Sequence, residues 1–306
     1  MKRSGLLLVL QFIFTFAFAQ LKWTCVDSLF SPLPPSVHVY KTTDSLGGAP
    51  NIAYYVEADL GDRNLEFTTD TSLHRRLKPS EFYIKNDRPL LVVNATFFSF
   101  ATNKNLNIVV KDGQKLSSNT ITVRGRGKDS IKNYNPHSSA IGINKKRKAD
   151  VAWVKADSIS TKILATQSPP RYAIAGTKDP NHFNKWRINT AIGGGPVLLQ
   201  EGDIKITNEE EFRFTGKAID DRHPRTAMGY TKNNKLIILV VEGRNPGIAS
   251  GATLKQEAEI FKDLGCWEAL NLDGGGSSCM LVNGKATIKV SDKEGQRPVP
   301  GVFIIR

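Results

Sequence analysis

Short apolar runs recur along residues 51–306, and glycine, asparagine or aspartate interrupts most of them. Each run is too short for a typical helix and rich in Val, Ile, Leu or aromatic residues, a pattern typical of β-strands. The runs are IAYYVEADL, RPLLVVNATFF, NIVVKDG, SAIGI, ADVAWV, GPVLLQEG, TAMGYT, KLIILVVEG, ALNLD, CMLVNG and GVFIIR. The pattern therefore predicts a chain made mainly of strands.

Three of these runs end in a tight-turn signal: VVKDGQ at 109–114, LLQEGD at 198–203 and LVNGK at 281–285. Asp-Gly and Asn-Gly adopt the positive φ angles that two-residue hairpin turns require. Each segment therefore predicts an antiparallel strand pair, and together they favour a mixed, largely antiparallel sheet.

One helix is predicted over LKQEAEIFKDL, residues 254–264. Thr253 is a cap, Gln256 completes a capping box, and Gly265 ends the helix. The apolar stripe of this helix consists of Leu254, Ala258, Phe261 and Leu264. Strands with few helices and no regular strand–helix alternation indicate an α+β fold, with twisted sheets and a few packed helices in a single domain over 51–306.

The first nineteen residues have the pattern of a secretory signal peptide. Lys2 and Arg3 precede an apolar run over 6–18, and Ala17-Phe18-Ala19 is a small-x-small cleavage site. The run is shorter than the roughly 20 residues of a spanning helix, which disfavours a membrane anchor. We expect cleavage after Ala19, a secreted or periplasmic protein, and no later membrane span.

Residues 20–50 are rich in Pro, Ser and Gly, which predicts an extended lead-in, with the folded part beginning near Ile52. The net charge of +13 falls to +11 without Lys2 and Arg3, and a basic exported protein suits anionic substrates. The basic cluster at 145–148 lies between two predicted strands and is interpreted as a solvated turn. No aromatic residues are interleaved with the basic clusters, so nucleic acid is not an expected partner.

The three cysteines are too few for a disulfide scaffold. A bridge between Cys266 and Cys279 stays open on the sequence alone, and it would leave Cys25 unpaired.

Polar residues follow several predicted strands at the point where each strand ends. Asn94 ends LLVVN, Glu242 and Arg244 end IILVVEGR, and Asp273 ends ALNLD. If these strand ends are aligned, two carboxylates, an amide and an arginine meet at one rim of the sheet. A strand-end turn explains each residue singly, but the four together favour a functional site.

Two glycine runs lie beside strands, Gly193 to Gly195 and Gly274 to Gly276. Glycine lets a ligand approach the backbone closely, and exposed N–H groups form concavities that bind anions. The segment DDRHPRTAMGYT adds His223, Arg225 and Thr226 ahead of a strand. Arginine suits bidentate recognition of phosphate or carboxylate, although a structural ion pair is the alternative interpretation.

Other catalytic patterns do not fit. A nucleophile elbow requires Gly-x-Ser-x-Gly, but Cys279 takes the place of the second glycine, and no phosphate loop ending in Gly-Lys-Ser/Thr is present. Zinc is disfavoured because the histidines are scattered with no close pair; they are His38, His74, His137, His182 and His223. A hard cation held by Asp273 and backbone oxygens stays open, and no other cofactor is expected.

Six segments, in this order, resemble the phosphodiester glycosidase family over about residues 85–306. They are NATFF (94–98), AIGGGPVLLQEG (191–202), RHPRTAMGY (222–230), LVVEGRNPG (239–247), LGCWEALNLDGGGSSCMLVNGK (264–285) and RPVPGVFII (297–305). The resemblance implies a secreted or luminal hydrolase that cleaves the bond between the anomeric carbon of a sugar and a phosphodiester oxygen.

The resemblance also implies which residues line the site. They are Asn94, Gly194, Arg225, Thr226, Arg244, Asp273, Gly275 and Ser277. The neighbouring Gly195, His223, Gly274 and Gly276 complete the predicted substrate-binding set. The chain departs from the family pattern at Glu242, where the family has aspartate, and at Cys279, where it has threonine.

The predicted catalytic residues are Asp273, Glu242 and Arg225. The hypothesis is that Arg225, Arg244 and glycine N–H groups hold the phosphate, while Asp273 acts as base or nucleophile and Glu242 assists. A phosphate leaving group is stable as an anion, so it depends less on a general acid than an ordinary glycoside does. Two alternatives stay open: a non-catalytic envelope protein that binds glycans, and a hydrolase of peptidoglycan or exopolysaccharide.

Overall fold

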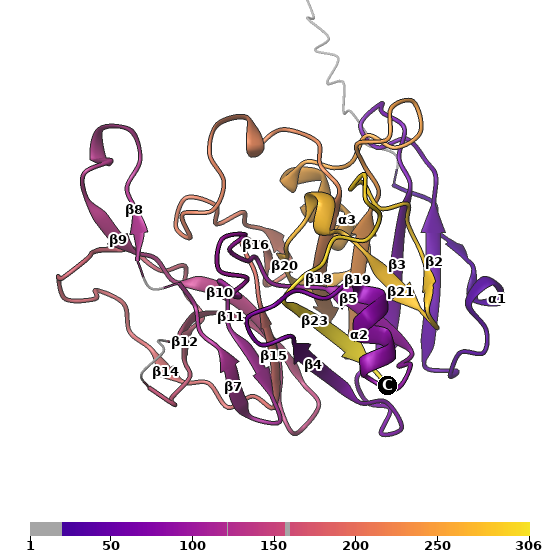
Figure 1. The fold of residues 1–306 in the computed structure, drawn as a ribbon, viewed down its shortest axis with the longest axis horizontal. Helices are drawn as coiled ribbons and strands as arrows, with labels where there is room; N and C mark the ends of the chain where they lie inside the picture. Colours follow the sequence, from indigo (N-terminus) through magenta and orange to yellow (C-terminus); the bar gives the residue numbers. More distant parts are fainter. Residues whose placement is uncertain (1–19, 121, 157–159) are drawn as a thin grey trace, which may run out of the picture.

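The computed structural model describes residues 20–120, 122–156 and 160–306. The predicted signal peptide lies outside the described residues. Figure 1 shows curved antiparallel sheets packed against one another, with a small three-stranded arm projecting at the upper left. Every pairing between the described strands is antiparallel, so the expected α+β class with a largely antiparallel sheet is confirmed.

The largest sheet has eight strands. In spatial order they are β1 (Thr24–Cys25), β2 (Val37–Thr42), β3 (Ala53–Asp59), β19 (Lys235–Val241), β18 (Arg225–Thr231), β20 (Cys266–Asn271), β16 (Val197–Gln200) and β17 (Asp203–Ile204).

A second sheet has seven strands and a third has five. The seven are β14 (Asn184–Lys185), β12 (Leu164–Thr166), β11 (Ala149–Lys155), β10 (Ser138–Ile143), β15 (Thr190–Gly193), β6 (Val109–Lys111) and β7 (Gln114–Ser117). The five are β22 (Lys285–Ala286), β21 (Met280–Val282), β5 (Leu91–Asn94), β23 (Gly301–Ile305) and β4 (Phe67–Thr71).

The projecting arm and the helices complete the fold. The arm consists of β13 (Ala173–Ile174), β9 (Asn133–Asn135) and β8 (Val123–Arg124). The α-helices are α1 (Asp27–Phe30), α2 (Pro79–Lys85) and α3 (Leu254–Asp263), and short 3₁₀ turns span Gly127–Asp129, Gly216–Ala218 and Gly275–Ser277. No helix among the described residues is long and apolar enough to cross a membrane.

The main hydrophobic core lies where the three large sheets meet. Val56 of the eight-stranded sheet, Trp153 of the seven-stranded sheet and Phe303 of the five-stranded sheet all belong to it and are almost fully buried. The opposite face of the eight-stranded sheet packs against α3, and α2 packs on the five-stranded sheet. Burial of both faces of the sheets explains why many strands read as continuous apolar runs.

All three predicted hairpins are confirmed: β6–β7, β16–β17 and β21–β22. In each turn both central residues have positive φ, for example Asn283 at 48° and Gly284 at 75°. The basic cluster after Ile143 forms the turn between β10 and β11, as the sequence predicts.

Helix α3 begins at Leu254 as predicted and ends at Asp263, one residue before the predicted end. The backbone N–H of Gln256 donates to Oγ1 of Thr253 over 3.1 Å, its side chain accepts from the Thr253 N–H, and Gly265 has φ +73° beyond the helix end. Glu257 is the unexpected residue of this helix, because a carboxylate in the first turn is completely buried.

Residues 20–50 differ from the expected extended lead-in. They contain β1, α1 and β2, and β2 pairs with β3 along its whole length, from Val37 opposite Ala58 to Thr42 opposite Ala53. The apolar residues of VHVYKT alternate and face the core, a signal that the surrounding Pro, Ser and Gly obscure. The folded part therefore begins before Ile52.

Cys266 and Cys279 are both free thiols in the structure. Cys266 packs in the cluster under α3, whereas Cys279 packs in the cluster under α2, so each fills a different part of the interior.

Candidate active site

Antiparallel pairing brings several predicted site residues to one edge of the eight-stranded sheet. Strand β18 starts where its neighbours β19 and β20 end, because Arg225 pairs with Val241 and Ala227 pairs with Asn271. Arg225 and Thr226 at the start of β18 therefore lie beside the segments that follow β19 and β20, which carry Arg244 and Asp273.

Asn94, at the end of β5, joins the five-stranded sheet to this edge. Its Nδ2 donates to the backbone oxygen of Asp273 over 2.5 Å. Its Oδ1 accepts from Oγ1 of Thr226 (2.9 Å) and from the N–H of Cys279 (3.0 Å). Asn94 and Thr226 are fully buried, so the structure assigns them to holding the site together.

A cavity of about 220 Å³ opens at this edge. It is lined by aromatic rings, cations, one carboxylate and a glycine loop: Phe97, Phe214, Ala218, His223, Arg225, Arg244, Asp273, Gly274, Gly275, Gly276 and Arg297. Its volume is below the roughly 300–1,000 Å³ of common ligand pockets, so the enclosed part of a ligand is small.

Asp273 is the one carboxylate among the lining residues. Burial raises the pKa of its carboxyl to about 7, against the opposing effects of the Ser277 hydroxyl, the Arg297 guanidinium and the Gly274 N–H. Its Oδ2 is buried without a hydrogen-bond partner among the described residues. Asp273 as a whole is partly exposed and lines the cavity, and its carboxyl changes charge near neutral pH.

Three guanidinium groups face the same cavity. Arg225 is almost completely buried, and its Nε donates to the backbone oxygen of Ala252 over 2.9 Å. Arg244 is exposed, and its Nη2 lies 3.3 Å from Nδ1 of His223. Arg297 donates from Nε to Asp292 over 2.7 Å. Most donor groups of these arginines remain available, which suits an anion.

Burial and the adjacent Arg225 and Arg244 lower the pKa of His223, so the imidazole is held neutral. The cavity therefore combines a neutral imidazole, three cations and one carboxyl. Ca²⁺ and Mg²⁺ require several oxygen ligands, so this set of side chains does not fit a hard cation.

The glycine loop after β20 packs too tightly for larger residues. A Cβ on Gly274 would lie 2.8 Å from the backbone oxygen of Pro224, and one on Gly276 would lie 2.1 Å from Nη2 of Arg297. The N–H of Gly275 donates to Pro224 over 2.8 Å, and Gly275 has φ +60°. The glycines thus let the loop approach two arginines and a neighbouring strand.

The structure does not bring Gly194 and Gly195 into this cavity. Both are buried, and their N–H groups donate to the backbone oxygens of Ser139 (2.9 Å) and Asn271 (2.7 Å). A Cβ on Gly195 would lie 2.3 Å from Oε2 of Glu211. This glycine run allows close packing at the junction between the sheets.

Glu242 is also absent from the cavity lining. Its Oε1 accepts from Nδ2 of Asn245 over 2.9 Å, and its Oε2 accepts from the N–H of Lys289 over 3.0 Å. It is buried, and both of its carboxylate oxygens are used in joining two loops. This geometry favours a supporting position behind the site.

Arg297 and the two phenylalanines were missed as site residues by sequence reasoning. The Phe97 and Phe214 ring centroids lie 5.9 Å apart, and the Arg225 guanidinium lies 5.9 Å from the Phe214 centroid. Phe97 and Arg297 occur within the family motifs NATFF and RPVPGVFII, which is the one signal that pointed toward them.

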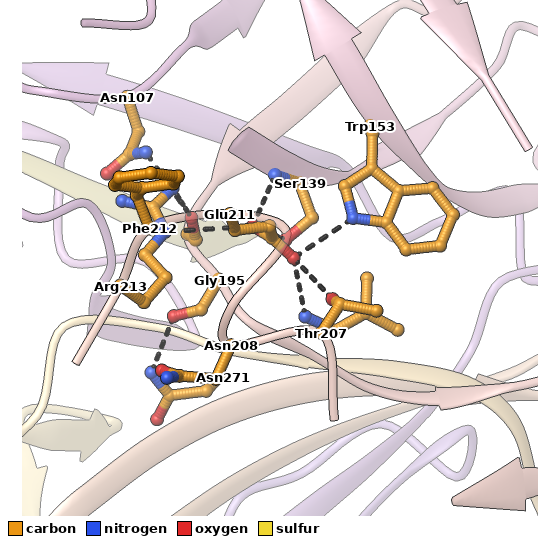
Figure 2. A network of polar contacts seen from close by, with 12 residues as sticks. Asn107, Ser139, Trp153, Gly195, Thr207, Asn208, Glu211, Phe212, Arg213 and Asn271 are labelled. Carbon is orange, nitrogen blue, oxygen red and sulfur yellow. Dashed lines mark hydrogen bonds and ion pairs between the residues drawn. The ribbon is translucent and has the colours of Figure 1, made fainter. Parts of the chain in front are cut away.

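A buried carboxylate behind the site was also missed. Figure 2 shows Glu211 accepting hydrogen bonds from Ser139, Trp153 and Thr207. It also accepts from the N–H of Val197 over 2.9 Å. These donors satisfy the ionised carboxylate of Glu211. Through them, Glu211 connects the loop after β17 to β10, β11 and β16.

Arg213 extends this network toward the cavity. Its Nε lies 3.6 Å from Oε2 of Glu211, and its Nη2 donates to the backbone oxygen of Gly194. Its guanidinium lies 5.3 Å from the ring centroid of Phe97, which lines the cavity. The Glu211 network therefore supports one wall of the site.

Sequence comparison finds relatives that match this chain over part of their length. Over 71 residues the chain is 41% identical to an uncharacterized SPbeta prophage-derived protein of Bacillus subtilis, covering 23% of this chain and 11% of that protein. Over 109 residues it is 29% identical to N-acetylglucosamine-1-phosphodiester alpha-N-acetylglucosaminidase of Mus musculus, covering 33% of this chain and 21% of the enzyme. The matches thus span about a fifth or less of these relatives.

Two solved structures share the fold over most of the chain. The zebrafish N-acetylglucosamine-1-phosphodiester alpha-N-acetylglucosaminidase catalytic domain, described as auto-inhibited by its pro-peptide, aligns with a TM-score of 0.61 at 20% identity, covering 94% of this chain and 88% of that one. A hypothetical protein from Synechocystis aligns with a TM-score of 0.60 at 14% identity, covering 94% and 68%. At these identities the likeness establishes the fold.

The family model for phosphodiester glycosidases matches residues 87–306, which is most of the chain. The matched region contains the whole cavity lining, from Phe97 to Arg297. The chain therefore belongs to the phosphodiester glycosidase family.

Proposed function

We propose that this protein is an exported hydrolase that cleaves the bond between the anomeric carbon of a sugar and a phosphodiester oxygen. Family membership supports the reaction class. The observation that carries the proposal is the arrangement of one partly buried carboxyl, Asp273, in a small cavity with Arg225, Arg244 and Arg297.

The three arginines bind the phosphodiester. Their guanidinium groups come from three separate segments, so they can surround an anion from different sides. As the bond to the sugar breaks, charge accumulates on the departing phosphate. Donors placed in advance at that position stabilise the transition state, and each is worth roughly 3 kcal/mol in comparable sites.

Asp273 acts as the base or nucleophile at the anomeric carbon. Most glycosidases use two carboxylates, one of which protonates the leaving group. The lining residues here provide one carboxylate, which agrees with a phosphate monoester that leaves as a stable anion. Glu242 assists indirectly, because its two oxygens hold the loops that carry Asn245 and Lys289.

The sugar occupies the side of the cavity lined by Phe97 and Phe214. Aromatic rings pack against the apolar faces of sugars, and the cavity encloses about 220 Å³. This space suits one sugar ring with its phosphate, with the rest of the substrate outside.

Export is part of the same proposal. The basic start, the apolar run over 6–18 and the Ala17-Phe18-Ala19 site support a cleaved leader and a secreted or periplasmic enzyme.

The activity test is a screen of nucleotide sugars, chromogenic sugar phosphodiesters and phosphate-containing wall polymers. The expected products are a free sugar and a phosphomonoester. Asp273→Asn should reduce turnover by about 10³-fold or more, with unchanged folding by circular dichroism, because it removes the attacking or activating carboxylate. Asp203→Asn, at an exposed aspartate on β17, is the matched control and should keep full activity.

Three results would contradict the proposal. One is near-normal turnover by Asp273→Asn. Another is tight binding of sugar phosphodiesters without product, which indicates a glycan-binding protein. The third is cleavage only of polymers that lack phosphate, which indicates an ordinary glycan hydrolase.

A further inference from the structure

A second group of chemically reactive side chains lies at the outer edge of the eight-stranded sheet, where β1 pairs with β2. Cys25 is directly opposite Tyr40 in this pairing. Paired residues face the same side of a sheet, and so do residues two apart on one strand. His38 therefore shares a face with Cys25, although the two are thirteen positions apart in the chain.

Asp27 reaches the same place from the start of α1. Its Oδ1 accepts from the N–H of Val39 over 2.7 Å, which fixes the carboxylate. Its Oδ2 lies 2.8 Å from Nδ1 of His38. The pairing of β1 with β2 and the first turn of α1 thus bring a thiol, a carboxylate and an imidazole together.

The ligating atoms of Cys25, Asp27 and His38 all lie within 4.8 Å of one another. Sulfur, imidazole nitrogen and carboxylate oxygen are the donors that Zn²⁺ prefers, and a tetrahedral zinc site needs only small adjustments from such spacing. Cys25 is exposed, and the other two are partly exposed, so an ion in solution can reach them.

A second carboxylate adds negative charge beside Cys25, Asp27 and His38. Glu57 on β3 is directly opposite His38 in the β2–β3 pairing. Directly opposite residues have Cβ atoms about 4.5–5.5 Å apart and project to the same face. Glu57 is partly exposed, so it is placed to attract a cation or to orient a bound water.

We propose that Cys25, Asp27 and His38 form a Zn²⁺ site with an open fourth position. Binding releases the thiol proton of Cys25 to solvent, leaves His38 neutral with its proton on Nε2, and replaces the contact between Nδ1 of His38 and Asp27 with bonds to the metal. None of the three residues lines the arginine cavity. The absence of a close histidine pair in the sequence does not exclude this site, because it uses a single histidine.

The structural consequence is a link between β1, α1 and the main sheet. Anything that binds only the folded chain stabilises it by mass action. Zn²⁺ therefore ties the first elements of the fold to β2 and raises the melting temperature.

The test uses the purified protein, freed of metal by a chelator, at micromolar concentration. Titration with Zn²⁺ against a chromogenic chelator should show one bound equivalent, and Co²⁺ should give the near-ultraviolet charge-transfer band of a thiolate ligand. Cys25→Ser and His38→Ala should each weaken Zn²⁺ binding by more than the roughly 10–100-fold that loss of an outer-shell partner costs.

His182→Ala is the matched control, because His182 is an exposed histidine outside this site. It should bind Zn²⁺ and respond in melting temperature as the unchanged protein does. Asp27→Asn provides a further variant that keeps the shape of the side chain, and it should also weaken binding. The proposal is overturned if the unchanged protein binds no Zn²⁺ at these concentrations. It is equally overturned if Cys25→Ser retains full affinity or if Co²⁺ gives no thiolate band.

Discussion

Asp273 combines two properties that rarely occur together in a carboxyl group. It reaches a cavity open to ligand, yet burial raises its pKa to about 7 and leaves Oδ2 without a hydrogen bond among the described residues. Burial disfavours the ionised form of a carboxyl group, so the carboxylate of Asp273 is more basic than a solvated one. The residue is thus suited to attack or to remove a proton near neutral pH.

This pKa predicts the pH dependence of catalysis. If Asp273 acts as base or nucleophile, kcat/KM rises with pH and levels off above about pH 7, because the ionised form is the active one. A pH series on a sugar phosphodiester whose own ionisation lies far from 7 measures this. A rate that instead falls through pH 7 would make Asp273 a general acid and contradict the assigned role.

Glu257 is a second carboxyl group whose pKa is raised by burial, and this affects the free energy of unfolding. It is completely buried in α3, both oxygens lack hydrogen bonds among the described residues, and burial raises its pKa to about 8 despite the nearby Arg225. Because this exceeds the ordinary value of 4.5, the stability it contributes is fully present below about pH 4.5 and is lost as pH rises through 8.

Replacing Glu257 with glutamine should remove this loss. The free energies of unfolding of Glu257→Gln and the unchanged protein should be similar near pH 4. The variant should be more stable by on the order of 5 kcal/mol at pH 9, since the pKa of Glu257 rises from 4.5 to about 8 and each pKa unit corresponds to about 1.4 kcal/mol. Urea unfolding from pH 4 to 9 measures the difference. If the free energies of unfolding of the two proteins change in parallel over that range, the pKa of Glu257 is not raised.

At the scale of elements, the turn after β20 shows what glycine contributes. Gly276 does not have positive φ, so alanine fits its backbone, but a Cβ there would lie 2.1 Å from Nη2 of Arg297. Gly276→Ala should therefore displace the arginine side chain while leaving the strands intact. We expect kcat/KM to fall about 10–100-fold, below the roughly 10²–10³-fold that loss of a whole donor costs.

A double variant tests whether the effect passes through Arg297. If it does, Gly276→Ala combined with Arg297→Ala should be no less active than Arg297→Ala alone, because the two changes remove the same interaction. Kinetics and melting temperatures of the single and double variants decide this. Losses that simply add would indicate that Gly276 acts independently of the arginine.

Elements defined by local residues were predictable. The hairpins follow from Asp-Gly, Glu-Gly and Asn-Gly pairs, and α3 follows from Thr253 and Gln256, since these signals act over a few residues. Strand β2 was not predicted, because its stability comes from pairing with β3 across a loop rich in Pro, Ser and Gly. The prediction of a lead-in was wrong for that reason.

At the scale of the whole molecule, the site depends on contacts between sheets. Antiparallel strand ends explain how Arg225 and Asp273 meet, and this much follows from pattern. The approach of Arg297 and Phe97 depends on how separate sheets pack, which strand patterns do not encode. The same packing buries Gly194 away from the cavity, so the two similar glycine runs have different environments.

The whole chain also carries a prediction about its processing. If the first nineteen residues are a cleaved leader, mass spectrometry of the protein recovered from an exporting host should give an N-terminus at Gln20. Replacing Ala17 and Ala19 with larger residues should block cleavage, because small side chains are required there. Recovery of an intact N-terminus from the exported protein would contradict cleavage.

In the proposed reaction, water or Asp273 attacks the sugar carbon and the phosphate leaves. Hydrolysis of a sugar phosphodiester in water labelled with oxygen-18 tests it most directly, with mass spectrometry of both products. The label is expected in the anomeric hydroxyl of the free sugar, with none in the phosphomonoester. Label in the phosphomonoester would mean attack at phosphorus and would contradict the proposed reaction.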